Sequence, residues 1–174
     1  MFVITTSNQG CSPSSFQVTD SLSANNELQK FDQKCSAPQG ISGSPKTIED
    51  AVGLINSLPF PVTIPCFLES LDRPLKVSLT NNTISGQPAA GNQNPRIFIM
   101  NGNLFISVVP DGSGQNLLEF SYRTGPDMSI KAEIEFPVIQ PVSSRAPYDR
   151  ILYNKGTSCG LCHVAEQKSP IVTF

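Results

Sequence analysis

The pattern of hydrophobic and polar positions divides the chain into stretches of different character. Residues 12 to about 45 are rich in Ser, Asn, Gln, Gly and Pro, and their apolar residues follow no period. Such a segment cannot bury enough apolar surface to offset the entropy lost on ordering it. We therefore expect residues 1–45 to form an export remnant and a polar linker, or extended chain lying over the domain. Residues 46–174 then form a single β-rich domain.

A short amphipathic helix is predicted at the start of this domain. Thr47 is a suitable N-cap, and Asp50 three residues later completes a variant of the capping box. Pro59 ends the pattern, because proline disrupts a helix interior. The apolar positions between these signals recur at a helical spacing, and they are Ile48, Ala51, Val52, Leu54, Ile55 and Leu58. The role of this helix is packing.

From Pro61 to Val138 the period changes to two, which is what a sheet with one dry and one wet face requires. Short links between successive strands predict a mainly β (α+β) fold, either an antiparallel β-sandwich or a curved meander. The expected strands are Val62–Cys66, Leu75–Thr80, Arg96–Met100, Asn103–Val109, Leu117–Tyr122 and Met128–Phe136.

Asn101-Gly102 is the strongest hairpin signal in the chain. It suits a two-residue type I′ turn, because both central residues of that turn need positive φ. Such a turn would pair Ile99 with Leu104 and Phe98 with Phe105.

The last segment carries the chemistry. Tyr148–Tyr153 fits a last strand or a turn of helix, and residues 156–158 then lead into Cys159-Gly160-Leu161-Cys162-His163. Two thiols three residues apart on a helical turn can each add to one vinyl group of a haem, and the following imidazole can reach the iron. The chain holds five Cys and one His, so roughly one shuffled sequence in 1,500 would show this spacing.

This stretch resembles the C-x-x-C-H haem-attachment motif of c-type cytochromes over residues 156–163. The resemblance implies one covalent haem c held by Cys159 and Cys162, with His163 as first axial ligand, on a C-terminal haem-bearing helix. The usual all-helical cytochrome fold does not transfer, because here the motif comes late in a β-rich chain. In that respect the chain is similar to the hydroxylamine-oxidising cytochromes, whose haem-linked Lys we do not identify here.

Three other interpretations of the Cys pair stay open. It could be a redox disulfide, although no βαβ pattern surrounds it. It could be half of a zinc site, although no second Cys or His cluster completes four ligands. It could also be a structural disulfide, or a pair of thiols in a domain without haem.

The expected sixth iron ligand is the thioether of Met128. The single His excludes a second imidazole, so the internal candidates are Met128 and Met100. Met128 lies on the apolar phase of its strand, which predicts an inward side chain, and beside a Gly-Pro turn where the backbone can adjust. Met100 adjoins the hairpin tip and shares its phase with Arg96, which predicts a wetter face. Either could be core filler instead.

Three further cysteines remain. Residues 7–12 look like a bacterial lipobox, except that Asn8 stands where that pattern has an aliphatic residue, so lipidation of Cys11 and an ordinary N-terminus are both open. Cys35 and Cys66 are then left, and we expect them to form a disulfide with Cα atoms within about 7 Å. Otherwise Cys66 is a small buried hydrophobe.

Charge and hydropathy narrow the function classes. The formal net charge of −2 gives no electrostatic reason to expect nucleic acid as a partner. No apolar run approaches the about 18 residues of a transmembrane span. We expect a periplasmic or extracellular monohaem cytochrome that passes electrons to a redox partner protein, with a lipid anchor at Cys11 as one option. The alternatives are a haem enzyme or gas-binding protein with an open distal site, and a non-redox β-sandwich interaction module with a structural Cys pair.

Overall fold

The computed structural model describes residues 35–80, 95–112, 114–153 and 156–161. All of the described residues lie in one compact unit, Lys34–Phe174. The lipobox-like residues 7–12, with Cys11, lie outside the described residues, as do Cys162 and His163. No helix in the described part of the chain is long and apolar enough to cross a membrane.

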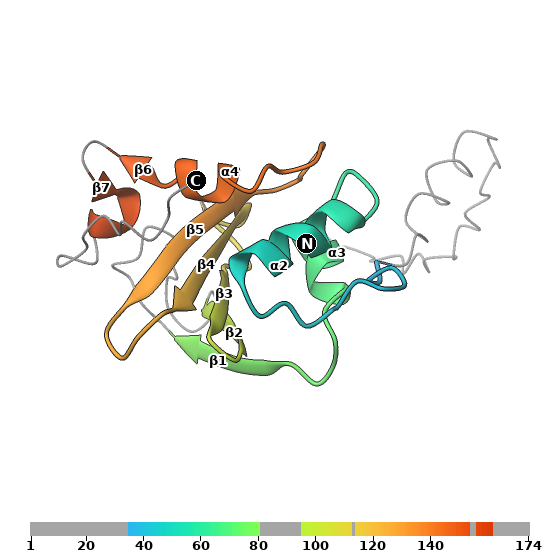
Figure 1. The fold of residues 1–174 in the computed structure, drawn as a ribbon, viewed down its shortest axis with the longest axis horizontal. Helices are drawn as coiled ribbons and strands as arrows, with labels where there is room; N and C mark the ends of the chain where they lie inside the picture. Colours follow the sequence, from blue (N-terminus) through green and yellow to red (C-terminus); the bar gives the residue numbers. More distant parts are fainter. Residues whose placement is uncertain (1–34, 81–94, 113, 154–155, 162–174) are drawn as a thin grey trace, which may run out of the picture. The chain divides into compact units, whose positions relative to one another are not determined.

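The centre of the domain is a five-stranded antiparallel meander in which each strand pairs with the next in sequence (Figure 1). The strands are β1 (Lys76–Thr80), β2 (Arg96–Asn101), β3 (Leu104–Val108), β4 (Leu117–Arg123) and β5 (Ser129–Glu135). The mainly β, antiparallel prediction is confirmed. The second sheet among the described residues has two strands, β6 (Leu152–Tyr153) and β7 (Gly156–Thr157), so these residues show a meander and no sandwich partner of similar size.

The predicted amphipathic helix is present as α2 (Ile48–Ser57). The Thr47 hydroxyl accepts a hydrogen bond from the Asp50 amide, and the Asp50 carboxylate accepts from the Thr47 amide. This is the expected capping box with Asp in place of Glu. The side chains predicted to face the core are buried.

The predicted strand Val62–Cys66 is wrong, because most of this stretch is the first turn of a helix, α3 (Ile64–Glu69). The Thr63 side chain caps this helix by accepting from the Cys66 amide, and Pro65 fits the first turn, where its missing N–H is not needed. Only Val62 is strand-like, since it forms an isolated bridge with Val138. The alternating apolar residues Val62, Ile64 and Cys66 therefore match a strand pattern, although most of this stretch is helical.

The hydrophobic core lies between one face of the five-stranded sheet and the helices α2 and α3. Figure 1 shows these two helices on the same side of the sheet. We call this the inner face. Its strand residues follow the predicted period of two. The largest contributors from helices and strands are Ile48, Leu54, Ile55, Phe67, Leu104, Ile106, Leu118 and Phe120.

The β2–β3 hairpin forms with a register that differs from the prediction. Asn101 pairs with Leu104 and Ile99 pairs with Ile106, so the two-residue loop is Gly102-Asn103. Gly102 has a φ of 63°, a conformation that favours glycine. The pairing shifts by two residues, which leaves every side chain on its predicted face, since the side-chain period of a strand is two.

The predicted disulfide between Cys35 and Cys66 is confirmed, with Cα atoms 5.1 Å apart. It ties the segment before α2 to α3. The same segment packs closely at Gly43, whose amide oxygen accepts from the Asp72 amide. A Cβ at Gly43 would lie 2.7 Å from the Ser70 carbonyl oxygen, so this position requires glycine. Residues 35–46 are therefore attached to the domain at two places, through the disulfide at Cys35 and through the contact at Gly43.

Candidate functional site

The segment that carries the proposed haem motif begins at α4 (Ala146–Asp149) and continues through β6 and β7. Tyr148–Tyr153 was expected to be a strand or a turn of helix, and it holds the end of α4 followed by β6. β7 runs directly into a 3-10 turn, η1 (Ser158–Leu161), which contains Cys159. The C-terminal haem-bearing helix that we expected is not supported, because this stretch of the described residues forms only a four-residue 3-10 turn.

Hydrogen bonds fix the position of Cys159 relative to the rest of the segment. In the small sheet Leu152 pairs with Thr157, and Tyr153 pairs with Gly156. The Ser158 amide then donates to the Ile151 carbonyl oxygen over 2.8 Å. Ile151 is buried, so the bond anchors the residue just before Cys159 to the domain. The Cys159 side chain is half-buried.

Charged side chains join this segment to the five-stranded sheet. Arg150 bridges two carboxylates of β5, with Nε 2.8 Å from Glu133 and a terminal nitrogen 2.9 Å from Glu135. A planar guanidinium suits such a double contact. Most of the Glu133 side chain is covered, so this contact is partly shielded from water. The segment before the motif is thus attached to β5 and cannot shift freely along it.

Tyr148 joins α4 to α2. Its hydroxyl donates a hydrogen bond to the Glu49 carboxylate. Burial, followed by that hydrogen bond and the negative charge of Glu49, raises the pKa of the Tyr148 hydroxyl far above its ordinary value. The phenol therefore stays protonated at neutral pH. It stabilises the position of α4 and offers no acid–base chemistry there.

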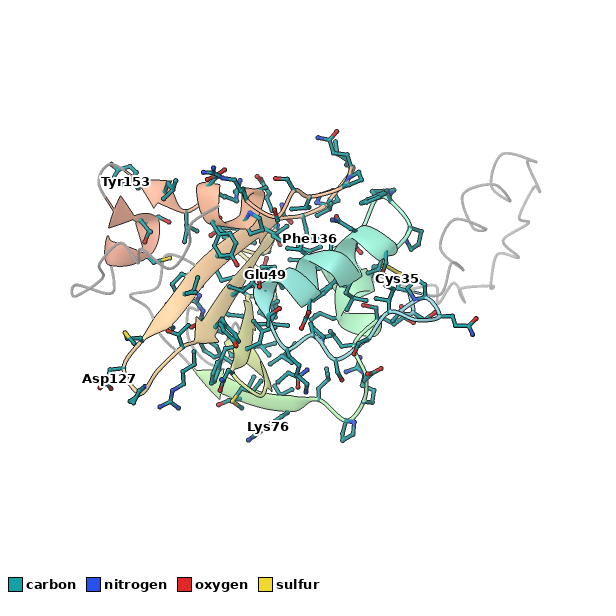
Figure 2. All side chains as sticks on the ribbon, viewed as in Figure 1. Cys35, Glu49, Lys76, Asp127, Phe136 and Tyr153 are labelled. Carbon is teal, nitrogen blue, oxygen red and sulfur yellow. A yellow bond between two sulfur atoms is a disulfide. The ribbon has the colours of Figure 1, made fainter. Side chains whose placement is uncertain are left out.

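The residues around Cys159 fit a haem in their chemistry. A thiol on a helical turn can form the thioether bond, and the small sheet that leads into this turn carries two large apolar residues. Leu152 is 51% exposed and Tyr153 is 58% exposed, and Figure 2 labels Tyr153 on this sheet. A haem is planar and mainly apolar, and it needs apolar neighbours of this kind to exclude water. Among residues whose placement is described, no three His, Cys, Asp or Glu side chains gather to hold a metal ion.

The expected orientation of Met128 is wrong. Met128 precedes the first residue of β5, and its side chain is 60% exposed instead of facing the core. Its carbonyl oxygen accepts from the amides of Thr124 and Gly125, and its methyl group lies over Gly125. Arg123 also donates to two carbonyl oxygens of this turn, so the backbone is held in place and cannot adjust as predicted. Ligation of iron by Met128 stays a prediction, because His163 lies outside the described residues.

Met100 occupies a more covered position than Met128. It is half-buried and lines a cavity of about 280 Å³ together with Asn101 and Gly102. The side-chain nitrogen of Asn101 donates to the Pro45 carbonyl oxygen, and the side-chain oxygen of Asn101 accepts from the Lys46 ammonium group. The expected difference in exposure between the two methionines is therefore reversed.

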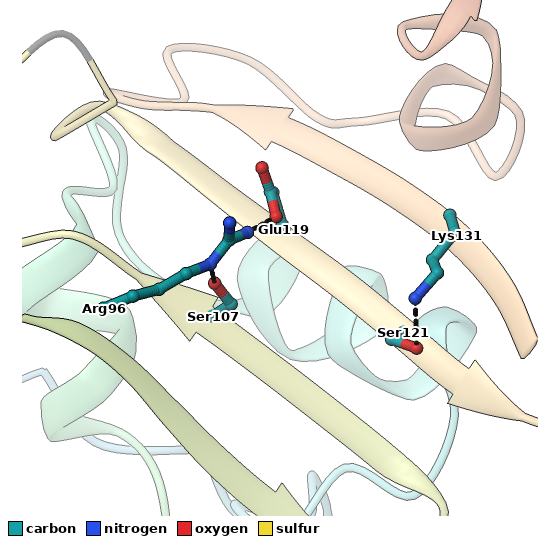
Figure 3. Close-up of polar contacts among 5 residues, drawn as sticks. All are labelled: Arg96, Ser107, Glu119, Ser121 and Lys131. Carbon is teal, nitrogen blue, oxygen red and sulfur yellow. Dashed lines mark hydrogen bonds and ion pairs between the residues drawn. The ribbon is translucent and has the colours of Figure 1, made fainter. Parts of the chain in front are cut away.

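The face of the sheet opposite the helices carries a set of polar contacts that the sequence did not indicate (Figure 3). We call it the outer face. Arg96 Nε donates to the Ser107 hydroxyl over 2.7 Å, and the same guanidinium pairs with Glu119 and lies over the Phe98 ring. Ser107 is buried, so this bond satisfies its hydroxyl.

A second polar pair on the outer face joins β5 to β4, where the Lys131 ammonium donates to the Ser121 hydroxyl over 2.9 Å (Figure 3). The two residues lie directly opposite each other in the register. A serine nucleophile would need a general base at hydrogen-bond distance. In the described residues, which include no histidine, Ser107 and Ser121 contact cations instead. We therefore assign these contacts to stabilising the outer face.

The candidate site thus consists of the small sheet, η1 with Cys159, and the anchoring contacts of α4. The sequence located Cys159 through its motif. For Leu152 and Tyr153 it showed only a pair of large apolar residues outside the alternating strands, because their positions depend on strand pairing. No protein-family model, curated protein or solved structure matches the chain, so every functional statement depends on its own residues.

Proposed function

We propose that this chain is a monohaem c-type cytochrome that transfers electrons to a partner protein. One haem c is attached through Cys159 and Cys162, and His163 is the first axial ligand. The observation that carries the proposal is the C-x-x-C-H spacing at the chain's single His. The helical turn at Cys159 supports it, because adjacent thioether bonds to one haem need the two thiols on the same side of a turn.

The haem would supply reversible one-electron chemistry between the two oxidation states of its iron. Each residue has a separate role in this proposal. The two cysteines hold the group at a fixed place, and His163 donates its imidazole nitrogen to the iron. The contacts of Ser158 and Arg150 fix the chain that leads into the attachment turn. The domain then holds the group rigidly, which keeps reorganisation small when an electron moves.

We assign the protein to the periplasm or the cell exterior, with lipidation of Cys11 as one way of attaching it to a membrane. The Cys35–Cys66 disulfide supports an oxidising compartment, since disulfides persist there and are rare in the cytosol. The proposed partner is a redox protein that meets the haem edge.

Expression with a cytochrome c assembly system tests the function. The wild-type protein should retain haem after denaturation and give a pyridine haemochrome spectrum of the c type. Cys159→Ser and Cys162→Ser together should lose covalent haem. Cys35→Ala is the matched control, because it removes a cysteine of the disulfide and should keep the haem. A wild-type protein without covalent haem would refute the proposal.

A haem enzyme or gas-binding protein with an open sixth position is the second candidate. The exposure of Met128 favours it, since the thioether expected to close the distal side is not directed into the core. Carbon monoxide separates the two candidates. An open site binds it rapidly on reduction, whereas a thioether-ligated haem binds it slowly or not at all. If the isolated protein instead contains a Cys159–Cys162 disulfide and no haem, the non-redox interaction module is favoured.

A further inference from the structure

The five-stranded sheet has one edge that the described residues leave open. β1 is the first strand of the sheet, and in the described part of the chain no further strand lies beyond it (Figure 1). The opposite edge strand, β5, packs against α4, and its Glu133 and Glu135 side chains contact Arg150. On β1, Val77 is 48% exposed and Leu79 is 62% exposed. An edge strand with exposed apolar side chains is a template for pairing with another strand.

The hydrogen bonds of the sheet show which backbone groups of β1 point to this edge. The backbone groups of successive residues in an antiparallel strand point alternately to its two sides. The Arg123 amide donates to the Asn103 carbonyl oxygen, so the backbone groups of Asn103 point to β4. Those of the next residue, Leu104, therefore point to β2, where they meet Asn101. Counting back along β2, the backbone groups of Phe98 point away from β3 and towards β1.

Val77 and Leu79 direct their amides and carbonyl oxygens out of the sheet. Phe98 lies opposite Ser78, so the backbone groups of Ser78 bond to β2, and those of its two neighbours point the other way. The register with β2 also places the side chains of these two neighbours on the inner face. The open edge thus presents, at two alternate residues, backbone donors and acceptors together with exposed apolar side chains.

We propose that β1 pairs with β1 of a second copy of this chain, antiparallel and centred on Ser78. In this register Val77 lies opposite Leu79 of the partner subunit, so their outward backbone groups bond to each other and their side chains meet on one face. Lys76 lies opposite Thr80 of the partner subunit, so like charges are not opposed. The net charge of −2 leaves little repulsion between copies. The edge is therefore complementary to itself, as a twofold interface requires.

Light scattering after size-exclusion chromatography of the full chain measures the association. Single strands bury a small area, so the pairing should be weak, and the mass should rise from one chain towards two with concentration. Leu79→Lys should weaken the association by about tenfold or more, because a charge then faces Val77 of the partner subunit. Ile139→Lys is the matched control. Ile139 is 73% exposed and lies after β5, away from β1, so this variant should associate like the wild type.

Cysteine cross-linking tests the register. Ser78 lies opposite Ser78 of the partner subunit, and its backbone groups bond to β2, so the two form a pair without hydrogen bonds between them. The Cα atoms of such a pair lie about 4.5 Å apart, which is within reach of a disulfide. Ser78→Cys should therefore give a disulfide-linked dimer under mild oxidation. Lys76→Cys should cross-link no more than the wild type, which measures the background from the native cysteines.

Three results would overturn the proposal. Wild-type protein that stays a single chain at about 1 mM does not pair at β1, which leaves the edge to a strand of another protein. A Leu79→Lys variant that associates as strongly as the wild type places the contact elsewhere. Cross-linking of Lys76→Cys as efficient as that of Ser78→Cys contradicts the register. None of these measurements depends on covalent haem, so this inference and the proposed function can fail separately.

Discussion

Removal of the Cys35–Cys66 disulfide should destabilise the domain by several kilocalories per mole. The bridge joins residues that are 31 positions apart. In the chain-entropy account, a loop of this length restricts the unfolded state by an amount that corresponds to about 3.7 kcal/mol at 25 °C. Native strain and residual structure in the unfolded chain usually lower such a value, so we expect a loss of about 2–4 kcal/mol in Cys35→Ala.

Urea unfolding followed by circular dichroism measures this loss. With a slope of about 2 kcal/mol/M for a domain of this size, the midpoint should fall by roughly 1–2 M. Wild-type protein in a reducing agent should unfold at the same midpoint as Cys35→Ala, because both lack the bridge. The double variant Cys35→Ala/Cys66→Ala should lose little more than the single one. If reduction leaves the wild-type midpoint unchanged, the assigned stabilising role of the bridge is wrong.

Three further changes test local contacts of the fold. Thr47→Ala removes the N-cap of α2 and should lower the free energy of unfolding by about 1 kcal/mol, whereas an unchanged stability would contradict the capping box. Gly43→Ala places a Cβ against the Ser70 carbonyl oxygen and should cost about 1–3 kcal/mol, and a stable variant would show that this contact can relax. Tyr148 has a raised pKa in the folded state, so its contribution is present below the unfolded value near about pH 10 and is lost as the pH rises above it. Stability should therefore fall in alkali, and Tyr148→Phe should reduce that fall; the same alkaline loss in the variant would contradict the assignment.

The elements with local signals could be predicted from the sequence. α2 has its cap, its stop signal and its apolar spacing close together, between Thr47 and Pro59, and nothing distant competes with them. α3 could not be predicted in this way, since its first turn alternates like a strand. What decides for helix is the Thr63 side chain, which satisfies the Cys66 amide, while the strand-like bond of Val62 goes to Val138, far along the chain.

The hairpin register and the orientation of Met128 also could not be predicted from local signals. Asn101 stays in β2 and bonds to Pro45 and Lys46, which precede it by more than fifty residues, so its place in the pairing is set by tertiary contacts. Met128 comes one residue before β5 begins, so the alternation of that strand does not include it. At that point the carbonyl oxygen of Met128 closes the turn to β5, and the period of two no longer applies.

In the candidate site, Cys159 is recognisable from a local sequence motif, whereas the positions of Leu152 and Tyr153 follow from strand pairing. The motif identified Cys159 because covalent chemistry demands a fixed spacing, which is visible in the sequence. The pairing of β6 with β7 depends on Ile151 and Arg150, which fix the segment against the domain through a backbone bond and two carboxylates of β5. A bound group keeps its orientation when the residues beside it are held by packing and by hydrogen bonds. On the proposed function, the five-stranded sheet therefore contributes by positioning the attachment turn.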